Sequence, residues 1–195
     1  MQSREPATRG TNLSGATATQ ADLEQLVRRL ADESEIRSVI ARFARASDHM
    51  DMDLLRSCYH EGATDAHGSY NGDVEGFVAW STGYNTKVES KFHHLGQSLI
   101  EIEGDEAWAE TYCVCHIRLR EDDGTRIDKA GIIRYVDLFE RRNGEWRIVH
   151  RKLVHHPGEV SPVEAEAVLA PRAFLARLDR DDPSYDRRPE SFLPK

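Results

Sequence analysis

Residues 126–156 read RIDKAGIIRYVDLFERRNGEWRIVHRKLVHH, and this stretch decides the fold. Apolar and polar residues alternate on both sides of Asn143-Gly144, which is the pattern of two β-strands, Arg126–Arg142 and Glu145–His156. Asn-Gly is a favoured hairpin turn because both residues tolerate a positive φ. The stretch therefore predicts a long antiparallel hairpin.

Two further strands are predicted before this hairpin. Lys87–Ile102 and Glu106–Arg120 also have a period of two,. Glu103-Gly104-Asp105 and Asp122-Asp123-Gly124 supply the turns between them and the hairpin,. The sequence thus predicts an antiparallel meander of four long strands.

Helical spacing replaces the two-residue period in the first part of the chain. Apolar residues recur at this spacing over Ala21–Asp48, and Ser34, a good N-cap residue, predicts a restart after a short break,. Short helices are expected at Asp51–Tyr59 and Val74–Trp80, and the turn-rich Glu61–Asn71 holds at most one short strand,. Three helices followed by four strands predict an α+β fold with helices on one face of a curved sheet.

The 195 residues fit one domain with two extensions,. Residues 1–20 are rich in Ser, Thr, Ala and Gly and are expected to form a disordered leader. The domain itself is expected over residues 21–156. Residues 157–195 are expected to form a C-terminal extension, with a short helix over Val163–Leu178 and then a charged tail.

Charge and hydropathy exclude several classes of function. The net charge of −8 argues against a nucleic-acid partner, which would require a concentrated basic face,. No window reaches the roughly 18 apolar residues of a membrane helix, and the first 20 residues lack the apolar core of a signal peptide. We therefore expect a cytoplasmic protein with no membrane partner.

Three cysteines, an odd number without a spaced framework, indicate a reducing compartment,. Cys113 and Cys115 lie two apart in a predicted strand and so point the same way, and with Cys58 they are interpreted as buried core thiols,. An open curved sheet leaves one face exposed, so a homodimer or homotrimer is expected.

Several motifs occur in an order that resembles a known family. Ala44-Arg45-Ala46-Ser47-Asp48 closes the long predicted helix, and His93-His94-Leu95-Gly96-Gln97 opens a predicted strand. Ile102–Ala107 covers the next turn, Tyr135 lies in the third long strand, and Asn143–Ile148 leads into the last one. Over about residues 22–156 this order resembles the SnoaL-like branch of the nuclear-transport-factor-2-like superfamily. That branch includes scytalone dehydratase, hexachlorocyclohexane dehydrochlorinase and bile-acid 7α-dehydratase.

The resemblance implies a cone-shaped α+β domain, with a curved antiparallel sheet wrapped around three N-terminal helices. It also implies an acid/base pair, because eliminating members pair an Asp at the end of the first helix with a His at the start of a strand. These positions fall on Asp48 and His93. Phe43 stands where bile-acid dehydratases have Tyr, and His155 where they have Arg, which argues against a bile-acid substrate.

Such a pair has a chemical role. Histidine supplies a base near neutral pH, and a carboxylate bonded to its other nitrogen fixes the tautomer. We expect a lyase in which His93 takes a proton from carbon and Asp48 orients it, releasing water or, by retro-aldol cleavage, a carbonyl fragment. The expected substrate is a hydrophobic, ring-bearing small molecule.

The remaining expectations concern the walls of the site and cofactors. The residues expected to bind the substrate are Phe43, Trp80, Phe92, Tyr112 and His155. No zinc spacing, phosphate loop or nucleophile elbow is present, so neither a metal nor another cofactor is expected.

Other interpretations stay open at this point. An isomerase or polyketide cyclase would use the same pocket with Asp48 as the proton shuttle, and a non-catalytic protein would only bind a ligand there. Asp48 would otherwise cap the turn into Asp51, and His93 would be a structural histidine.

Overall fold

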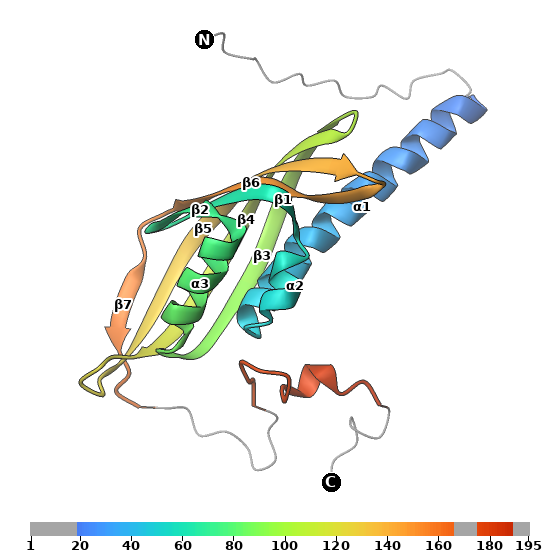
Figure 1. Ribbon diagram of the computed structural model, residues 1–195. Coiled ribbons are helices and arrows are strands. Elements are labelled where there is room, and N and C mark those ends of the chain that lie inside the picture. The colour runs from blue at the N-terminus through green and yellow to red at the C-terminus, as the bar shows by residue number, and fades with distance from the viewer. Residues whose placement is uncertain (1–18, 166–174, 189–195) are drawn as a thin grey trace.

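Strand pairing defines the architecture, which is a curved, unclosed sheet of seven strands combined with three α-helices (Figure 1). The structure is a computed structural model that describes residues 19–165 and 175–188. Its helices are α1 (Gln20–Asp48), α2 (Met52–Arg56), α3 (Val74–Asn85) and the short 3₁₀ helix η1 (Pro183–Tyr185). Its strands are β1 (Tyr59–His67), β2 (Tyr70–Asp73), β3 (Val88–Glu103), β4 (Glu106–Arg120), β5 (Arg126–Arg142), β6 (Glu145–His155) and β7 (Glu159–Pro162).

The four long strands β3 to β6 form the predicted antiparallel meander, with ends within one residue of those expected. Asn143 and Gly144 both have positive φ, 54° and 84°, as the hairpin prediction requires. The sheet order is β2-β1-β6-β5-β4-β3. The period of two therefore identified the central part of the sheet correctly.

The first two strands differ from the expectation. The predicted second helix ends at Arg56, and the segment read as turn-rich forms β1 and β2. β1 runs parallel to β6, so the sheet is not wholly antiparallel, and α3 follows two strands instead of preceding the sheet. Gly62 and Gly68 have φ of 78° and 65°, which makes the segment resemble turns in sequence. β1 pairs with β6, whose residues are distant from it in the sequence, and local sequence patterns carry no information about such a pairing.

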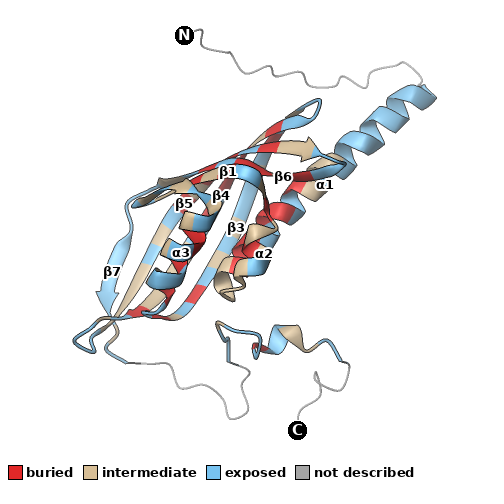
Figure 2. Cartoon of the chain, viewed as in Figure 1, coloured by how far each residue is buried: buried red, intermediate tan, exposed pale blue. Residues whose placement is uncertain are grey.

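Helix α1 is one uninterrupted helix, so the expected break at Ser34 is wrong. The Ser34 carbonyl accepts a hydrogen bond from the Ser38 hydroxyl at 2.8 Å within the helix. The N-terminal half extends beyond the sheet and is exposed (Figure 2). Its apolar residues repeat at helical spacing but lack a packing partner within the described ranges, whereas the half from Ile36 onward lies on the sheet.

Trp146 anchors the inner half of α1 to the sheet. Its side chain is fully buried. Its indole N–H donates to Asp32 at 2.8 Å, and its backbone N–H donates to Glu35 at 3.0 Å. Both acceptors are on α1, so this residue fixes the helix against the start of β6.

The C-terminal extension contributes to the sheet and to the end of α1. β7 pairs with Ile127–Ala130 of β5, a strand that the sequence did not predict. Of the predicted helix over 163–178, residues 163–165 and 175–178 are not helical, and 166–174 lie outside the described residues. Arg180 forms an ion pair with Asp51 at 3.2 Å, and the Arg177 carbonyl lies 3.3 Å from Nδ1 of His49. The described part of the tail therefore packs beside the end of α1.

Residues 1–18 of the predicted leader lie outside the described residues, and Thr19 already caps α1. Of the helices in the described ranges, none combines the length and the apolar character that crossing a membrane would require.

A fully buried ion pair lies between α1 and the sheet. Arg151 of β6 donates to both carboxylate oxygens of Asp137 on β5, each at 2.7 Å, and both side chains have 0% exposure. The guanidinium carbon lies 3.9 Å from the ring centroid of Phe43 on α1 and 4.2 Å from that of Tyr135 on β5. Burial raises the pKa of Asp137, and the positive charge of Arg151 opposes that shift.

We expect Asp137→Asn to lower the free energy of unfolding by about 3–5 kcal/mol, because it leaves the Arg151 charge buried without a counter-charge. Asp128→Asn is the matched control, since Asp128 lies on the same strand and pairs with Arg118 at 2.7 Å in a partly exposed position. Its loss should be about 1 kcal/mol or less. If urea denaturation shows that the two variants lose equal free energy of unfolding, the buried pair does not contribute more than the partly exposed one.

Candidate active site

The sequence-predicted pair comes together in the structure. Nδ1 of His93 lies 2.6 Å from Oδ1 of Asp48, and the backbone N–H of His93 donates to Oδ2 of the same carboxylate at 3.1 Å. Because an ionised carboxylate only accepts, Nδ1 carries the proton in this contact. His93 therefore presents Nε2 as its remaining nitrogen, with 7% of its side chain exposed against 20% for Asp48.

Asp48 lies at the point where α1 ends and the backbone changes direction. Asp48 is the last helical residue, and Met50 has a positive φ of 51° that turns the chain toward α2. The side chain of Asp51 caps α2 by accepting from the backbone N–H of Leu54 at 3.1 Å. Asp51, not Asp48, thus does the capping, and both oxygens of Asp48 are engaged by His93.

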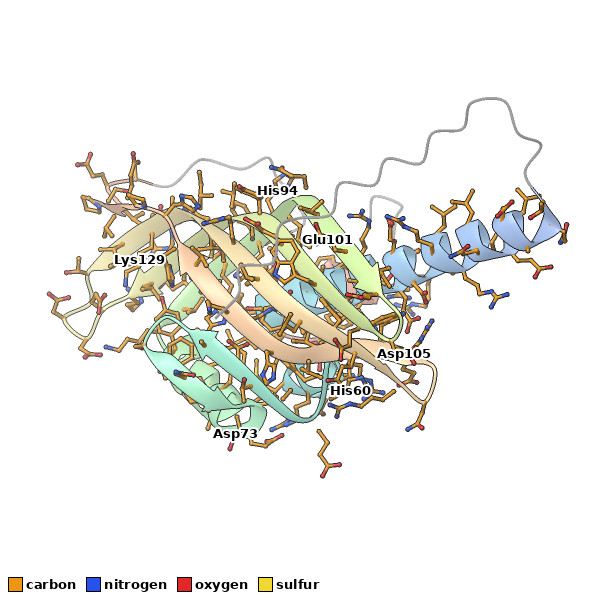
Figure 3. The ribbon with its side chains drawn as sticks, turned by 90° about the horizontal axis from the view of Figure 1, so that it is seen from above. His60, Asp73, His94, Glu101, Asp105 and Lys129 are labelled. Carbon is orange, nitrogen blue, oxygen red and sulfur yellow. The ribbon has the colours of Figure 1, made fainter. Side chains whose placement is uncertain are left out.

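Strand alternation places His93 on the helix-facing side of the sheet. His93 is directly opposite Cys115, and Leu95 is opposite Cys113, which is buried. Residues directly opposite each other share a face, and successive residues alternate between faces. His94 consequently lies on the other face; in Figure 3 the strands lie in front of the helices and His94 is labelled on β3.

The electrostatics of His93 favour its protonated form. Burial by itself would lower the pKa of His93, but the hydrogen bond to Asp48 and the contact with Cys115 outweigh it and raise the pKa to about 9. At neutral pH the imidazole is consequently protonated in the resting site. Any role as a base requires loss of that proton first.

Sequence analysis missed two neighbours of His93. Sγ of Cys115 lies 3.5 Å from Nε2, and the residue is half-buried, whereas Cys58 and Cys113 are buried as expected. Lys91 has 8% exposure, and its Nζ donates to Oδ1 of Asn85 on α3 at 2.8 Å. Burial lowers the pKa of Lys91 to about 8, and the charges of Asp48 and Cys115 oppose that shift.

Strand spacing contained a signal for these neighbours. Lys91 and His93 are two apart on a strand, so they share a face. A lysine on the apolar face of a strand, beside a proposed catalytic histidine, is a feature that the alternation alone could have identified.

Two of the aromatic residues expected to bind substrate lie on the helix-facing side. Phe43 is 1% exposed and packs on Tyr135 with ring centroids 5.6 Å apart. Trp80 on α3 is half-buried and stacks on Tyr84 at 5.9 Å, with 13° between the rings. It also stacks on Phe77 at 6.0 Å, which creates an aromatic row along α3.

Phe92 and Tyr112 are placed on the outer face, which corrects their expected role in the site. Phe92 precedes His93, is 49% exposed and stacks on His116 at 5.5 Å. Tyr112 is 37% exposed, and the guanidinium of Arg134 lies 5.7 Å from its ring. The prediction that Phe92 and Tyr112 line the substrate site is wrong because an aromatic side chain is equally compatible with either face of a strand.

His155 lies on the same face of the sheet as His93 but at the periphery of the site. It pairs with Ile133, which in turn pairs with Cys113, so it shares the helix-facing side with His93. The residue is exposed, and its Nε2 lies 3.5 Å from the position that a Cβ on Gly68 would occupy. It therefore lies near the turn between β1 and β2.

A second group of polar side chains is buried deeper on the same face. Tyr59 donates a hydrogen bond to the fully buried Asp65, whose other oxygen lies 3.3 Å from Nδ1 of His67. Burial lowers the pKa of His67. In the described part of the chain, the hydroxyl of Tyr135 and Nη1 of Arg151 are buried without a hydrogen-bond partner. Unpaired buried donors are unusual and available to an acceptor on a ligand.

A pocket of about 380 Å³ opens between the turn after α1 and the C-terminal segment. Its walls include His49, Met50, Asp51 and Leu178, but not the Asp48–His93 pair. Among residues 19–165 and 175–188, no group of three or more His, Cys, Asp and Glu side chains is arranged to hold a metal ion.

Comparison with protein families assigns this architecture. The model of the SnoaL-like domain matches residues 28–152, which include both members of the pair. The chain belongs to the SnoaL-like family. Comparison with curated protein sequences gives no match.

Solved structures of the SnoaL-like kind share the fold at low sequence identity. A putative scytalone dehydratase from Novosphingobium aromaticivorans is 15% identical, with a TM-score of 0.62 over 73% of this chain and 94% of that one. A LinA-type3 hexachlorocyclohexane dehydrochlorinase from Novosphingobium barchaimii is 17% identical, with a TM-score of 0.61 over 74% and 99%. The Kfla4162 protein from Kribbella flavida is 19% identical, with a TM-score of 0.58 over 67% and 95%.

The raised pKa of His93 predicts how stability depends on pH. The folded-state pKa, about 9, lies above the ordinary value of 6.5, so folding tightens proton binding. This contribution to the free energy of unfolding is complete below about pH 6.5 and is lost as pH rises to about 9. A shift of this size corresponds to about 3 kcal/mol.

Urea denaturation at pH 6, 7.5 and 9 measures this effect. Asp48→Asn should remove most of the fall in stability, and His94→Gln, which changes the neighbouring outer-face histidine, should retain it. Parallel curves for the wild type and Asp48→Asn would show that the pair does not control the titration.

Proposed function

We propose that this protein is a cofactor-independent lyase that eliminates water or a similar fragment from a hydrophobic, ring-bearing small molecule. The observation that supports this proposal is the 2.6 Å contact between Asp48 and His93, made by residues from the end of α1 and the start of β3. A base oriented by a carboxylate is the arrangement required for removing a proton from carbon.

His93 Nε2 is the atom proposed to take the proton, because Nδ1 is held by Asp48. The electron pair of the broken C–H bond forms the new double bond, and the leaving group departs from the adjacent carbon. Lys91 lies two residues away on the same face, roughly 6.5 Å along the strand, and provides a cation for the departing oxygen.

The apolar character of the substrate is proposed from the side chains around the pair. Trp80, Phe77 and Tyr84 form stacked aromatic rows on α3, and flat aromatic surfaces favour ring-bearing ligands,. The names of two similar structures, a putative dehydratase and a dehydrochlorinase, refer to eliminations and support the same class of reaction.

Substitution of either member of the pair tests the proposal. Asp48→Asn and His93→Gln are each expected to reduce kcat/KM by at least about 10²-fold, the usual contribution of general base catalysis. The assay screens aromatic and steroidal alcohols for the absorbance of the conjugated product. His94→Gln is the control and should remain active, and near-UV circular dichroism should show all three variants folded. Full activity in His93→Gln would exclude His93 as the base.

The rate should also depend on pH in a defined direction. Only the neutral form of His93 accepts a proton, and the pKa is raised to about 9 in the free protein. Because the proposed Lys91 cation has a pKa of about 8, we expect kcat/KM to rise about tenfold per pH unit up to about pH 8, to level off between about pH 8 and 9, and to fall above that,. A profile that already levels off near pH 6.5 would show that the active form has an unperturbed histidine.

An isomerase or cyclase is the second candidate, and the protonated state of His93 favours it. In that reaction Asp48 shuttles the proton, and His93 has a secondary role as a hydrogen-bond donor that the reaction can lose. An active His93→Ala variant together with an inactive Asp48→Asn variant would support this candidate over the lyase.

A further inference from the structure

We propose that Cys115 is a nucleophile, and that Cys115, His93 and Asp48 form a Cys–His–Asp triad that adds to α,β-unsaturated carbonyl compounds. The basis is a continuous chain of contacts: Cys115 Sγ lies 3.5 Å from His93 Nε2, and His93 Nδ1 lies 2.6 Å from Asp48. A nucleophile next to a base that is itself oriented by a third group is the general signature of an activated side chain.

The other two cysteines allow this position to be distinguished from an ordinary buried thiol. Cys113 shares the strand and the face of Cys115 but is 1% exposed, and its Sγ contacts the Val114 carbonyl. Cys58 is fully buried, with its Sγ 3.4 Å from the Leu54 carbonyl. Cys115 differs in being half-buried and in facing an imidazole.

Two cations lie on the face of the sheet that carries Cys115. The imidazolium that forms when His93 takes a proton stabilises negative charge on a neighbouring sulfur, as a lysine does. Lys91 is the second cation on this face, and its hydrogen-bond partner is the neutral amide of Asn85. The titratable groups coupled electrostatically to Cys115 are Tyr84 from α3, Lys91 and His93 from β3, Cys113 from its own strand and Tyr135 from β5, and Asp48 lies on the other side of His93.

The same face offers unpaired donors for the polar end of a ligand. The Tyr135 hydroxyl and Arg151 Nη1 are buried and have no hydrogen-bond partner within the described residues. Tyr135 lies near enough to the thiols for charge on Cys113 and Cys115 to raise its pKa further above the ordinary value, in addition to the effect of burial. Arg151 Nη1 is therefore available to a ligand oxygen, whereas the Tyr135 hydroxyl lies beside the Cys113 thiol.

The addition is balanced without any further reactant. In the reactive form, His93 Nε2 has lost its proton to solvent and takes the proton of the Cys115 thiol, and the thiolate forms a bond to the β-carbon of the acceptor. The π electrons move toward the carbonyl oxygen, and the resulting enolate takes the proton from Nε2 at its α-carbon. The products are a saturated thioether and neutral His93, and the reverse sequence releases the acceptor.

Cyclohexenone, an apolar ring-bearing enone, is the probe for the full-length protein. We expect mass spectrometry and peptide mapping to locate one adduct on Cys115, formed at pH 7 at least about tenfold faster than the adduct of glutathione, a free thiol. Cys113→Ser should behave as the wild type, and Cys115→Ser should form no adduct.

His93→Gln provides the second measurement. Loss of the imidazole should slow formation of the adduct at pH 7 by at least about tenfold. Asp48→Asn serves as an independent variant of the same pair if His93→Gln fails to fold. The proposal is overturned if the wild-type protein reacts no faster than glutathione, if His93→Gln and Asp48→Asn leave its rate unchanged, or if Cys115 reacts only after denaturation.

The adduct and the elimination are measured separately. A wild-type protein that forms the adduct but eliminates water from no candidate would refute the lyase alone. A protein that eliminates water but reacts with cyclohexenone no faster than glutathione would refute the nucleophile alone.

Discussion

The buried pair of Arg151 and Asp137 is the interaction on which the placement of the other elements depends. Two fully desolvated charges are stable only if each is neutralised and hydrogen-bonded, and the bidentate contact between β6 and β5 meets that requirement,. The guanidinium also lies between Phe43 of α1 and Tyr135 of β5. Because Phe43 is five residues before Asp48, this stack sets the height at which α1 ends over the sheet. The position of the Asp48 carboxylate follows from it.

The site itself is organised by the imidazole of His93, which has a different partner on each ring nitrogen. Asp48 accepts from Nδ1 and also from the backbone N–H of His93, so turning the ring breaks the Nδ1 hydrogen bond while the backbone N–H keeps the carboxylate in place. Cys115 lies at Nε2, and Lys91 is on the same face two residues away. The resulting charge balance explains why the pKa of His93 is raised in spite of burial, whereas burial lowers the pKa of His67, which shares Asp65 with Tyr59. Two histidines in similarly buried positions thus acquire opposite protonation states from their partners.

The accuracy of prediction varied with the range of the interactions that decide each element. Strands β3 to β6 were predicted within one residue because alternation and Asn-Gly turns act over a few neighbours. β1 was missed because its pairing with β6 is parallel and remote in sequence. The apolar spacing in the first half of α1 predicted burial that does not occur, since the sheet reaches only the second half. Phe92 and Tyr112 were assigned to the site, yet alternation places them on the outer face together with His94.

By itself, the sequence determined the α+β class and the meander, and through the family resemblance it led to the prediction that Asp48 and His93 form a pair. These features are encoded locally, in residue periodicity and in short motifs. Only the tertiary structure decided that the two side chains lie 2.6 Å apart, that Cys115 and Lys91 join them, and that a guanidinium is buried beneath. The physical reason is that burial and electrostatic coupling are properties of neighbours in space. They arise only when the helix end and the strands have been brought to one face of the sheet.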